Sequence, residues 1–165
     1  MKLTLFAAFC LLVALSVCAA APAQFAGTWA LDKQKSDALP GPMAGADITM
    51  NVTQDDKQIA VETKYTGTGE DLPAQKVSYG LDGVEKDFEF SGRLPGKGKV
   101  AAKWLSDGKA LELHATRTVN FQGEDRTIAI TEKWELGEDG KTLKVARKVD
   151  FGQGSFDSNL VFNKK

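Results

Sequence analysis

The stretch Phe25-Ala26-Gly27-Thr28-Trp29-Ala30-Leu31 decides the fold of this 165-residue chain. It places a Gly-x-Trp sequence on a short run of strand-forming character, directly after an apolar leader. From there on, apolar and polar residues alternate with a period of two, and turn residues interrupt the alternation at short intervals. Such alternation is typical of β-strands with one buried face. The sequence therefore predicts an all-β protein whose first strand covers residues 25–32.

Residues 1–23 are predicted to be a cleavable signal peptide. Lys2 supplies the positive start, residues 3–17 form an apolar run, and small alanines follow, with cleavage expected between about Ala20 and Ala23. The apolar run falls short of the ~20 residues that a membrane-spanning helix needs. We therefore expect a secreted or periplasmic protein with no stable membrane insertion after the leader is removed.

Cysteine and charge narrow the function classes. The only two cysteines, Cys10 and Cys18, lie in the leader, so the mature chain has no disulfide and no thiol nucleophile. The chain has 21 basic and 22 acidic residues, and removing Lys2 leaves 20 against 22, a charge of −2. A nearly neutral chain without basic blocks argues against nucleic acid as a partner.

Nine further strands follow the first in the predicted domain, residues 24–165. The alternation places them at 47–54, 58–66, 74–81, 84–91, 97–105, 109–121, 126–136, 142–151 and 155–163. Asp82-Gly83 predicts a hairpin between the fourth and fifth strands. The longest irregular piece, residues 33–46, contains prolines and glycines that resist helix; both a functional lid and a solvated connection fit it.

The chain resembles the calycin group, which comprises lipocalins, fatty-acid-binding proteins and lipocalin-like proteins exported by bacteria. The resemblance rests on Gly27-Thr28-Trp29, on a meander of about ten strands in about 140 mature residues, and on the segment 132–143. It implies a single antiparallel up-and-down β-barrel with an apolar ligand cavity, closed at one end by Gly27 and Trp29. It does not imply a particular ligand. The chain departs from fatty-acid-binding proteins in lacking a helix-turn-helix after the first strand, and from many animal lipocalins in lacking a disulfide.

Three charged residues share the parity of the inward apolar positions: Arg117, Glu132 and Arg147. If 137–142 form a loop, Leu136 faces Leu143 and Glu132 faces Arg147. If Gly123-Glu124 form the preceding turn, Arg117 faces Ile130 and lies diagonal to Glu132, within reach of a long side chain. An arginine partner offsets much of the cost of burying a carboxylate.

Two interpretations of this cluster stay open. It is either an internal ion-pair network that fixes strand register, or a site where the excess positive charge meets a ligand carboxylate. In the second case the apolar wall would include Tyr79, Trp104, Trp134 and Phe151, with Trp29 at the closed end.

The residues give little support for catalysis. His114, the only histidine, has outward parity, and the absence of cysteine from the mature chain disfavours a zinc site. There is no Gly-x-Ser-x-Gly elbow. We therefore predict no catalytic residues, no metal and no cofactor.

The leading hypothesis is a monomeric, exported carrier of a small hydrophobic or amphipathic ligand. The alternative is a filled barrel that acts as a structural or protein-interaction module. A lipocalin-like isomerase or hydrolase with Glu132 as base is a minor third.

Overall fold

A computed structural model describes residues 21–165 except 70–71, 93–94, 106–107 and 122. The predicted signal peptide therefore lies outside the described residues apart from its last three. The described chain consists of one short 3-10 helix, η1 (Gly41–Met43), and ten strands. The strands are β1 (Gly27–Leu31), β2 (Asp47–Gln54), β3 (Gln58–Thr66), β4 (Gln75–Gly80), β5 (Lys86–Phe90), β6 (Gly96–Trp104), β7 (Ala110–Phe121), β8 (Glu124–Leu136), β9 (Thr142–Asp150) and β10 (Ser155–Lys164).

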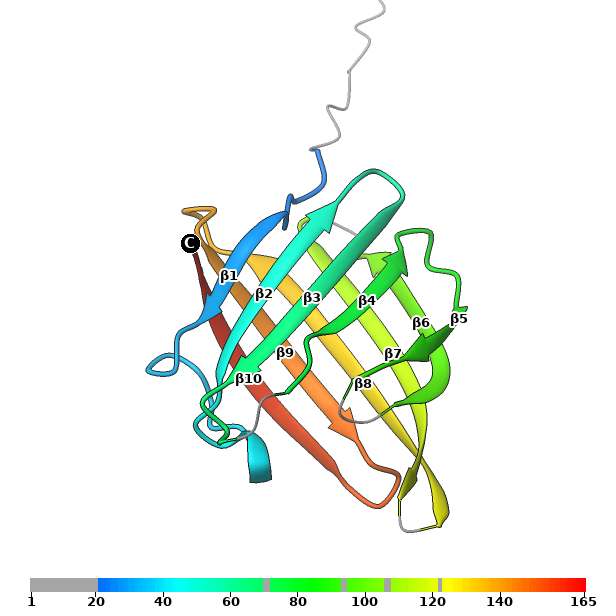
Figure 1. Cartoon of the computed structure of the whole chain (residues 1–165). Helices are drawn as coiled ribbons and strands as arrows, with labels where there is room; N and C mark the ends of the chain where they lie inside the picture. Colours follow the sequence, from blue (N-terminus) through cyan, green and yellow to red (C-terminus); the bar gives the residue numbers. More distant parts are fainter. Residues whose placement is uncertain (1–20, 70–71, 93–94, 106–107, 122) are drawn as a thin grey trace, which may run out of the picture.

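The ten strands form one antiparallel sheet that curves into a nearly closed barrel (Figure 1). Strands that follow each other in sequence pair in the sheet, except β4 and β5, and β1 also pairs with β10, as in Trp29 opposite Lys164. The fold prediction, an all-β antiparallel barrel of about ten strands, is therefore confirmed. In the part of the chain that is described, no helix is long and apolar enough to cross a membrane.

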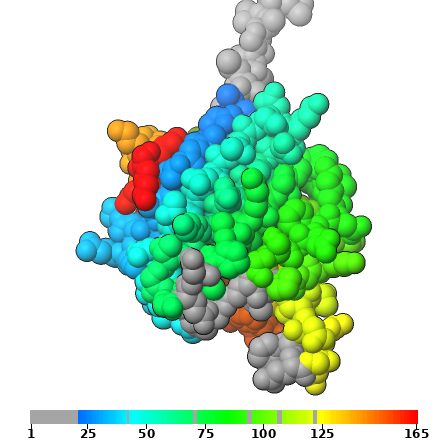
Figure 2. All heavy atoms as spheres, viewed as in Figure 1, coloured from blue at the N-terminus to red at the C-terminus, as the bar shows by residue number. Residues whose placement is uncertain are grey.

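The predicted hairpin at Asp82-Gly83 is wrong. β4 and β5 are the two edges of the sheet and are not hydrogen-bonded to each other among the described residues. The turn is instead tied to β6, because Gly83 N donates to the carbonyl of Ala102 over 2.9 Å. The two edges still lie side by side (Figure 1), and the green atoms of this part of the chain adjoin one another in the space-filling view (Figure 2). Turn chemistry fixes where the chain reverses, whereas barrel closure decides whether the flanking strands pair.

Strand alternation places the core inside the barrel, as the sequence predicts. In β2, for example, Ile48, Met50 and Val52 are at most 6% exposed, while the residues between them face outward. The main cluster of buried side chains continues through β3, β7, β8, β9 and β10. A second, smaller cluster lies beneath β4 and β5 and includes Val77 and Phe90. The hydrophobic effect therefore acts on one continuous inner surface.

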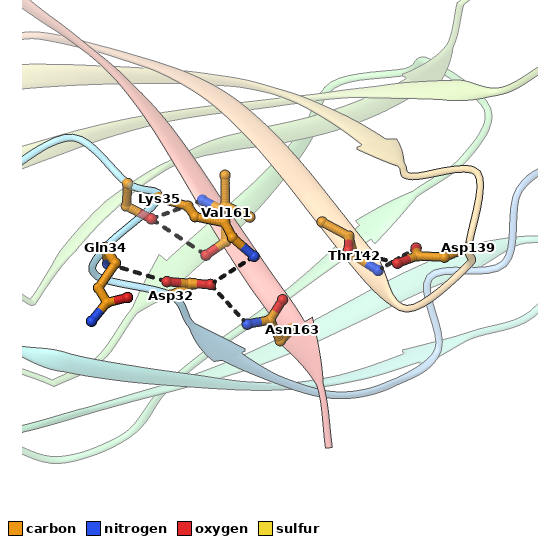
Figure 3. A network of polar contacts seen from close by, with 8 residues as sticks. Asp32, Gln34, Lys35, Asp139, Thr142, Val161 and Asn163 are labelled. Carbon is orange, nitrogen blue, oxygen red and sulfur yellow. Dashed lines mark hydrogen bonds and ion pairs between the residues drawn. The ribbon is translucent and has the colours of Figure 1, made fainter.

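The long connection after β1 follows the edge of β10 before it turns to β2. Asp32 accepts a hydrogen bond from Asn163 Nδ2 over 3.0 Å, as Figure 3 shows. Ser36 Oγ accepts from the Val161 backbone over 2.9 Å, and Asp37 Oδ2 from the Asn159 backbone over 2.6 Å. The last two bonds satisfy backbone N–H groups of β10 that β1, only five residues long, does not reach.

Candidate functional site

The barrel encloses a cavity of about 90 Å³. Most of its wall is aliphatic, from side chains such as Ile48, Met50, Val61 and Leu113. Polar and charged groups are concentrated among the remaining lining residues: Thr63, Tyr65, Gln75, Tyr79, Arg117, Glu132 and Arg147. The cavity therefore has a mainly apolar wall and a group of hydrogen-bonding and charged side chains.

Glu132 and Arg147 form the ion pair that the sequence predicts. The register places Leu136 opposite Leu143 and Glu132 opposite Arg147. Arg147 Nε lies 3.3 Å from Glu132 Oε1, and each side chain is 22% exposed. The second carboxylate oxygen accepts a hydrogen bond from Trp134 Nε1 over 2.9 Å. The carboxylate is thus held on both sides, which offsets the cost of placing its charge inside the barrel.

The Nε of Arg147 is buried but makes no hydrogen bond of acceptable geometry, even though Glu132 is close. A buried donor without an acceptor costs about 1–3 kcal/mol. An oxygen atom bound in the cavity in suitable geometry would recover that energy. This donor is a specific point at which an anionic ligand could be recognised.

The predicted position of Arg117 is wrong by two residues. β7 ends at Phe121 and β8 begins at Glu124, so Arg117 faces Ile128 and Leu113 faces Glu132. The turn lies one residue before the predicted Gly123-Glu124. Arg117 is therefore four positions along β7 from Leu113, the residue opposite Glu132, instead of the predicted two. Arg117 still lines the cavity, and its Cζ lies 5.1 Å from the centre of the Phe90 ring.

Two glycines of β6 make that placement of Arg117 possible. Gly98 is the register partner of Arg117, and a Cβ there would meet the backbone carbonyl of Thr116. A Cβ at Gly96 would lie 3.2 Å from Arg117 Cγ. Without these side chains, the guanidinium reaches across β6 to Phe90 on β5. The signal in the sequence is a pair of glycines, Gly96 and Gly98, that share the inward parity of Val100 and Ala102.

Both tyrosines of the chain, Tyr65 and Tyr79, line the same cavity. Burial raises the pKa of Tyr65, and Arg147 partly opposes this through its charge and a hydrogen bond. Burial also raises the pKa of Tyr79, and the negative charge of Glu132 adds to the effect. Tyr79 is one of the predicted site residues. Tyr65 is not, although it shares the inward parity of Ile59 and Val61 on β3.

The positive charges influence each other as well. Burial lowers the pKa of the Arg117 guanidinium; the Tyr65 and Tyr79 phenols oppose this effect, and the charge of Arg147 adds to it. Arg117, Arg147 and the two phenols therefore lie close enough to interact across one small space. This arrangement can bind an anion by charge and by several hydrogen-bond donors.

The aromatic residues predicted to line the wall separate into two groups. Trp134 is 1% exposed and lines the cavity, and Tyr79 does too. Trp104 lies outside the lining and stacks on Phe25, with ring centres 6.0 Å apart. Phe151 was expected to face the cavity, but it is 50% exposed. It directly follows the last residue of β9, at a hairpin tip beyond the packed interior.

One end of the barrel is closed by the segment before β1. Phe25 is fully buried, packs edge-to-face on Trp134 at 5.7 Å and accepts a hydrogen bond from Trp29 Nε1 over 2.8 Å. The Phe25 and Ala23 backbones are bonded to Gln54 at the end of β2, and Ala23 N also donates to Gly108 O over 3.1 Å. Trp29 is fully buried in this closure.

Gly27 begins β1 at φ 139, a conformation that other residues rarely adopt. The space above it holds the side chain of Lys164, whose ammonium lies 5.3 Å from the centre of the Trp29 ring.

Catalytic and metal-binding groups remain sparse on the described part of the chain. His114 lies on the outer face of β7, half-buried, with Nδ1 3.1 Å from Thr131 Oγ1. Among the described residues no group of three or more His, Cys, Asp or Glu is placed to hold a metal ion. Glu132 is the one carboxylate in the cavity lining, and it is engaged by Arg147 and Trp134.

Comparisons with known proteins bear on the fold. No protein-family model matches the chain, and no curated protein matches it in sequence. Solved structures do match. A structure described as the REP1-NXSQ fatty acid transporter has a TM-score of 0.55 and 17% identity, covering 85% of this chain and 95% of its own. The zebrafish ileal bile acid-binding protein, complexed with cholic acid, has a TM-score of 0.51 and 14% identity, covering 86% and 98%. The chain therefore has the antiparallel β-barrel fold of these structures, which is the fold that its resemblance to the calycin group implies.

Proposed function

We propose that this protein binds a small amphipathic ligand with an anionic group inside its barrel. The observation that carries the proposal is the cavity itself, whose aliphatic wall is combined with Arg117, Arg147 and Glu132. Apolar surface favours an apolar ligand body. The three ionisable groups with charges at neutral pH sum to +1, which favours an anionic ligand group. The named neighbours, a fatty acid transporter and a bile acid-binding protein, support the same ligand class.

The charge arrangement supports a specific position for the anion. Glu132 repels a ligand carboxylate, whereas the Arg147 Nε on the same pair lacks a hydrogen-bond acceptor. The Tyr65 phenol interacts with Arg147, and its raised pKa keeps it protonated and able to donate. We place the ligand anion among Arg147, Tyr65 and Arg117, with the body against the aliphatic wall.

The proposal includes export and a monomeric state. The leader of residues 1–23 has the order of a positive start, an apolar run and small residues that signal peptidases require. Cell fractionation and N-terminal sequencing test this part, and a new terminus between Ala20 and Ala23 is expected. Light scattering of the mature protein tests for a monomer.

A filled barrel without a ligand is the second candidate. It is favoured by one observation: about 90 Å³ is well below the ~300–1,000 Å³ of typical small-molecule pockets. On this reading the Glu132–Arg147 pair fixes the register of β8 and β9, and the protein acts through its outer surface.

Calorimetry separates the two candidates. Mature protein is freed of co-purifying lipid, which native mass spectrometry identifies, and octanoate is titrated into it. We expect saturable binding at one site, and Arg147→Met should weaken it about 10- to 100-fold, because a hydrogen bond to a charged group contributes ~1.5–3 kcal/mol.

Arg126→Met is the matched control, since Arg126 is 49% exposed on β8 and should leave binding unchanged. Circular dichroism verifies that each variant is folded. Absence of binding by any acid or neutral apolar probe would support the filled barrel, and equal binding by wild type and Arg147→Met would remove the arginine from the site.

A further inference from the structure

The size of the cavity restricts the ligand more sharply than its chemistry does. The cavity of about 90 Å³ is several-fold smaller than the ~300–1,000 Å³ of typical small-molecule pockets. A long-chain fatty acid such as hexadecanoate has about twice as many non-hydrogen atoms as hexanoate or benzoate. The preformed space therefore fits a compact molecule better than a long chain.

The anion-binding groups occupy the same small space as the apolar wall. Arg117, Arg147 and Tyr65 line the cavity together with Ile130 and Leu113. A carboxylate bound at the arginines occupies part of this small space. The remainder accommodates a short aliphatic chain or a single ring.

Large side chains limit expansion toward the closed end. Trp134 is 1% exposed, and both its hydrogen bond to Glu132 and its contact with the Phe25 ring hold it in place. Beyond it, Phe25 and Trp104 stack on each other. A longer ligand would have to displace packed aromatic rings and break the hydrogen bond that orients the carboxylate.

Expansion toward the sheet edges is limited in a similar way. Phe90 on β5 is 4% exposed, packs edge-to-face on Phe88 at 4.9 Å and lies under the Arg117 guanidinium. Tyr79 on β4 packs against the same cluster. The aromatic residues on both edge strands thus fill the barrel on this side.

We propose that the cavity selects compact carboxylates, with a short aliphatic chain or one ring, over long-chain fatty acids. This inference rests on the proposed function, because it names the ligand class of the same site. The arginines select the charge, and the packed aromatic side chains select the size.

A size series at constant charge tests the inference. Butanoate, hexanoate, octanoate, benzoate and hexadecanoate are titrated into the delipidated mature protein by calorimetry, the last below its critical micelle concentration. Hexanoate, octanoate or benzoate should bind at least tenfold more tightly than hexadecanoate. Hexanol and benzyl alcohol, which match two acids in size, should bind at least tenfold more weakly than those acids.

An enlarged cavity provides the second arm. Ile130→Ala removes three carbons from the lining, and the affinity optimum should move toward longer acids. Val84→Ala is the matched control, because Val84 is 57% exposed and should leave the size preference unchanged.

The outcomes are distinguishable. Hexadecanoate binding as tightly as the short acids, or tighter, overturns the size inference and leaves the proposed function intact. An optimum that Ile130→Ala does not move also overturns it. Failure of every acid and every neutral probe to bind overturns the proposed function itself.

Discussion

Replacing Glu132 by leucine removes the carboxylate that Arg147 and Trp134 share. We expect Glu132→Leu to lower the free energy of unfolding by about 2–4 kcal/mol. Breaking a fully buried pair costs ~3–5 kcal/mol, and we take about half of that because both side chains are 22% exposed. The Trp134 N–H loses its acceptor as well, which adds about 1 kcal/mol.

Arg147→Met should cost less, about 1–3 kcal/mol, because Glu132 keeps the hydrogen bond from Trp134. In the double variant Glu132→Leu/Arg147→Met, neither charge is left without its partner. The loss should therefore be smaller than the sum of the two single losses, by about 1–3 kcal/mol.

Urea unfolding followed by tryptophan fluorescence measures all four proteins, with the slopes checked for a common denatured state. Losses that add to within about 0.5 kcal/mol would show that the two residues do not interact, and would refute the pairing. Glu132→Gln is a useful fifth protein, because it keeps shape and an acceptor for Trp134 while removing the charge. It isolates the electrostatic part of the loss.

Three further predictions concern the closed end, the β6 glycines and the phenols. Phe25→Ala should destabilise the protein by about 3–5 kcal/mol in urea unfolding and change the emission of the tryptophans that Phe25 contacts. Phe151 is exposed, so Phe151→Ala should stay within about 0.5 kcal/mol of wild type, and equal losses by the two variants would contradict the role of Phe25 in closing the barrel end. Gly98→Ala should lower stability by about 1–3 kcal/mol, because the new Cβ meets the Thr116 carbonyl. Gly80→Ala is the control, since its new Cβ meets flexible Lys86 and Asp82 side chains, and an equal loss of stability by this variant in a thermal melt would count against the prediction. The stability that the two buried phenols contribute should be full below about pH 10 and should fall as the pH rises toward the raised folded-state pKa values of Tyr65 and Tyr79, because the phenols lose their protons first in the unfolded chain. Tyrosinate absorbance should rise only near unfolding, and a rise near pH 10 in the folded protein would refute the burial of both phenols.

The sequence predicts the barrel well because strand alternation and the barrel interior obey the same period of two. All ten predicted strands are present, and Glu132 faces Arg147 because a well-marked loop at 137–142 sets that register. The prediction that Arg117 faces Ile130 is wrong for the complementary reason. A single glycine at 123 does not specify the position of its turn, and a shift of the turn by one residue moves the facing partner by two.

Parity also says nothing about depth along the barrel axis. Phe151 has the parity of an interior residue but lies beyond the end of β9, and it is exposed. Phe25 was predicted to lie in the first strand but precedes β1, and it is fully buried because it crosses the barrel end. Such positions depend on the shape of the whole barrel, which local patterns do not encode.

The double apolar variant also decides between the two interpretations of the charged pair. Replacing a buried ion pair by apolar residues of similar size is often neutral or stabilising by ~1–4 kcal/mol. If Glu132→Leu/Arg147→Met is as stable as the natural chain, the pair is not needed to hold β8 and β9 in register. Arg147, whose buried Nε makes no hydrogen bond, then has ligand binding as its remaining role in the cavity. Loss of octanoate binding by this stable variant would establish that role. If the variant is unstable and the strands slip, the pair belongs to the fold, and recognition of the anion rests on Arg117.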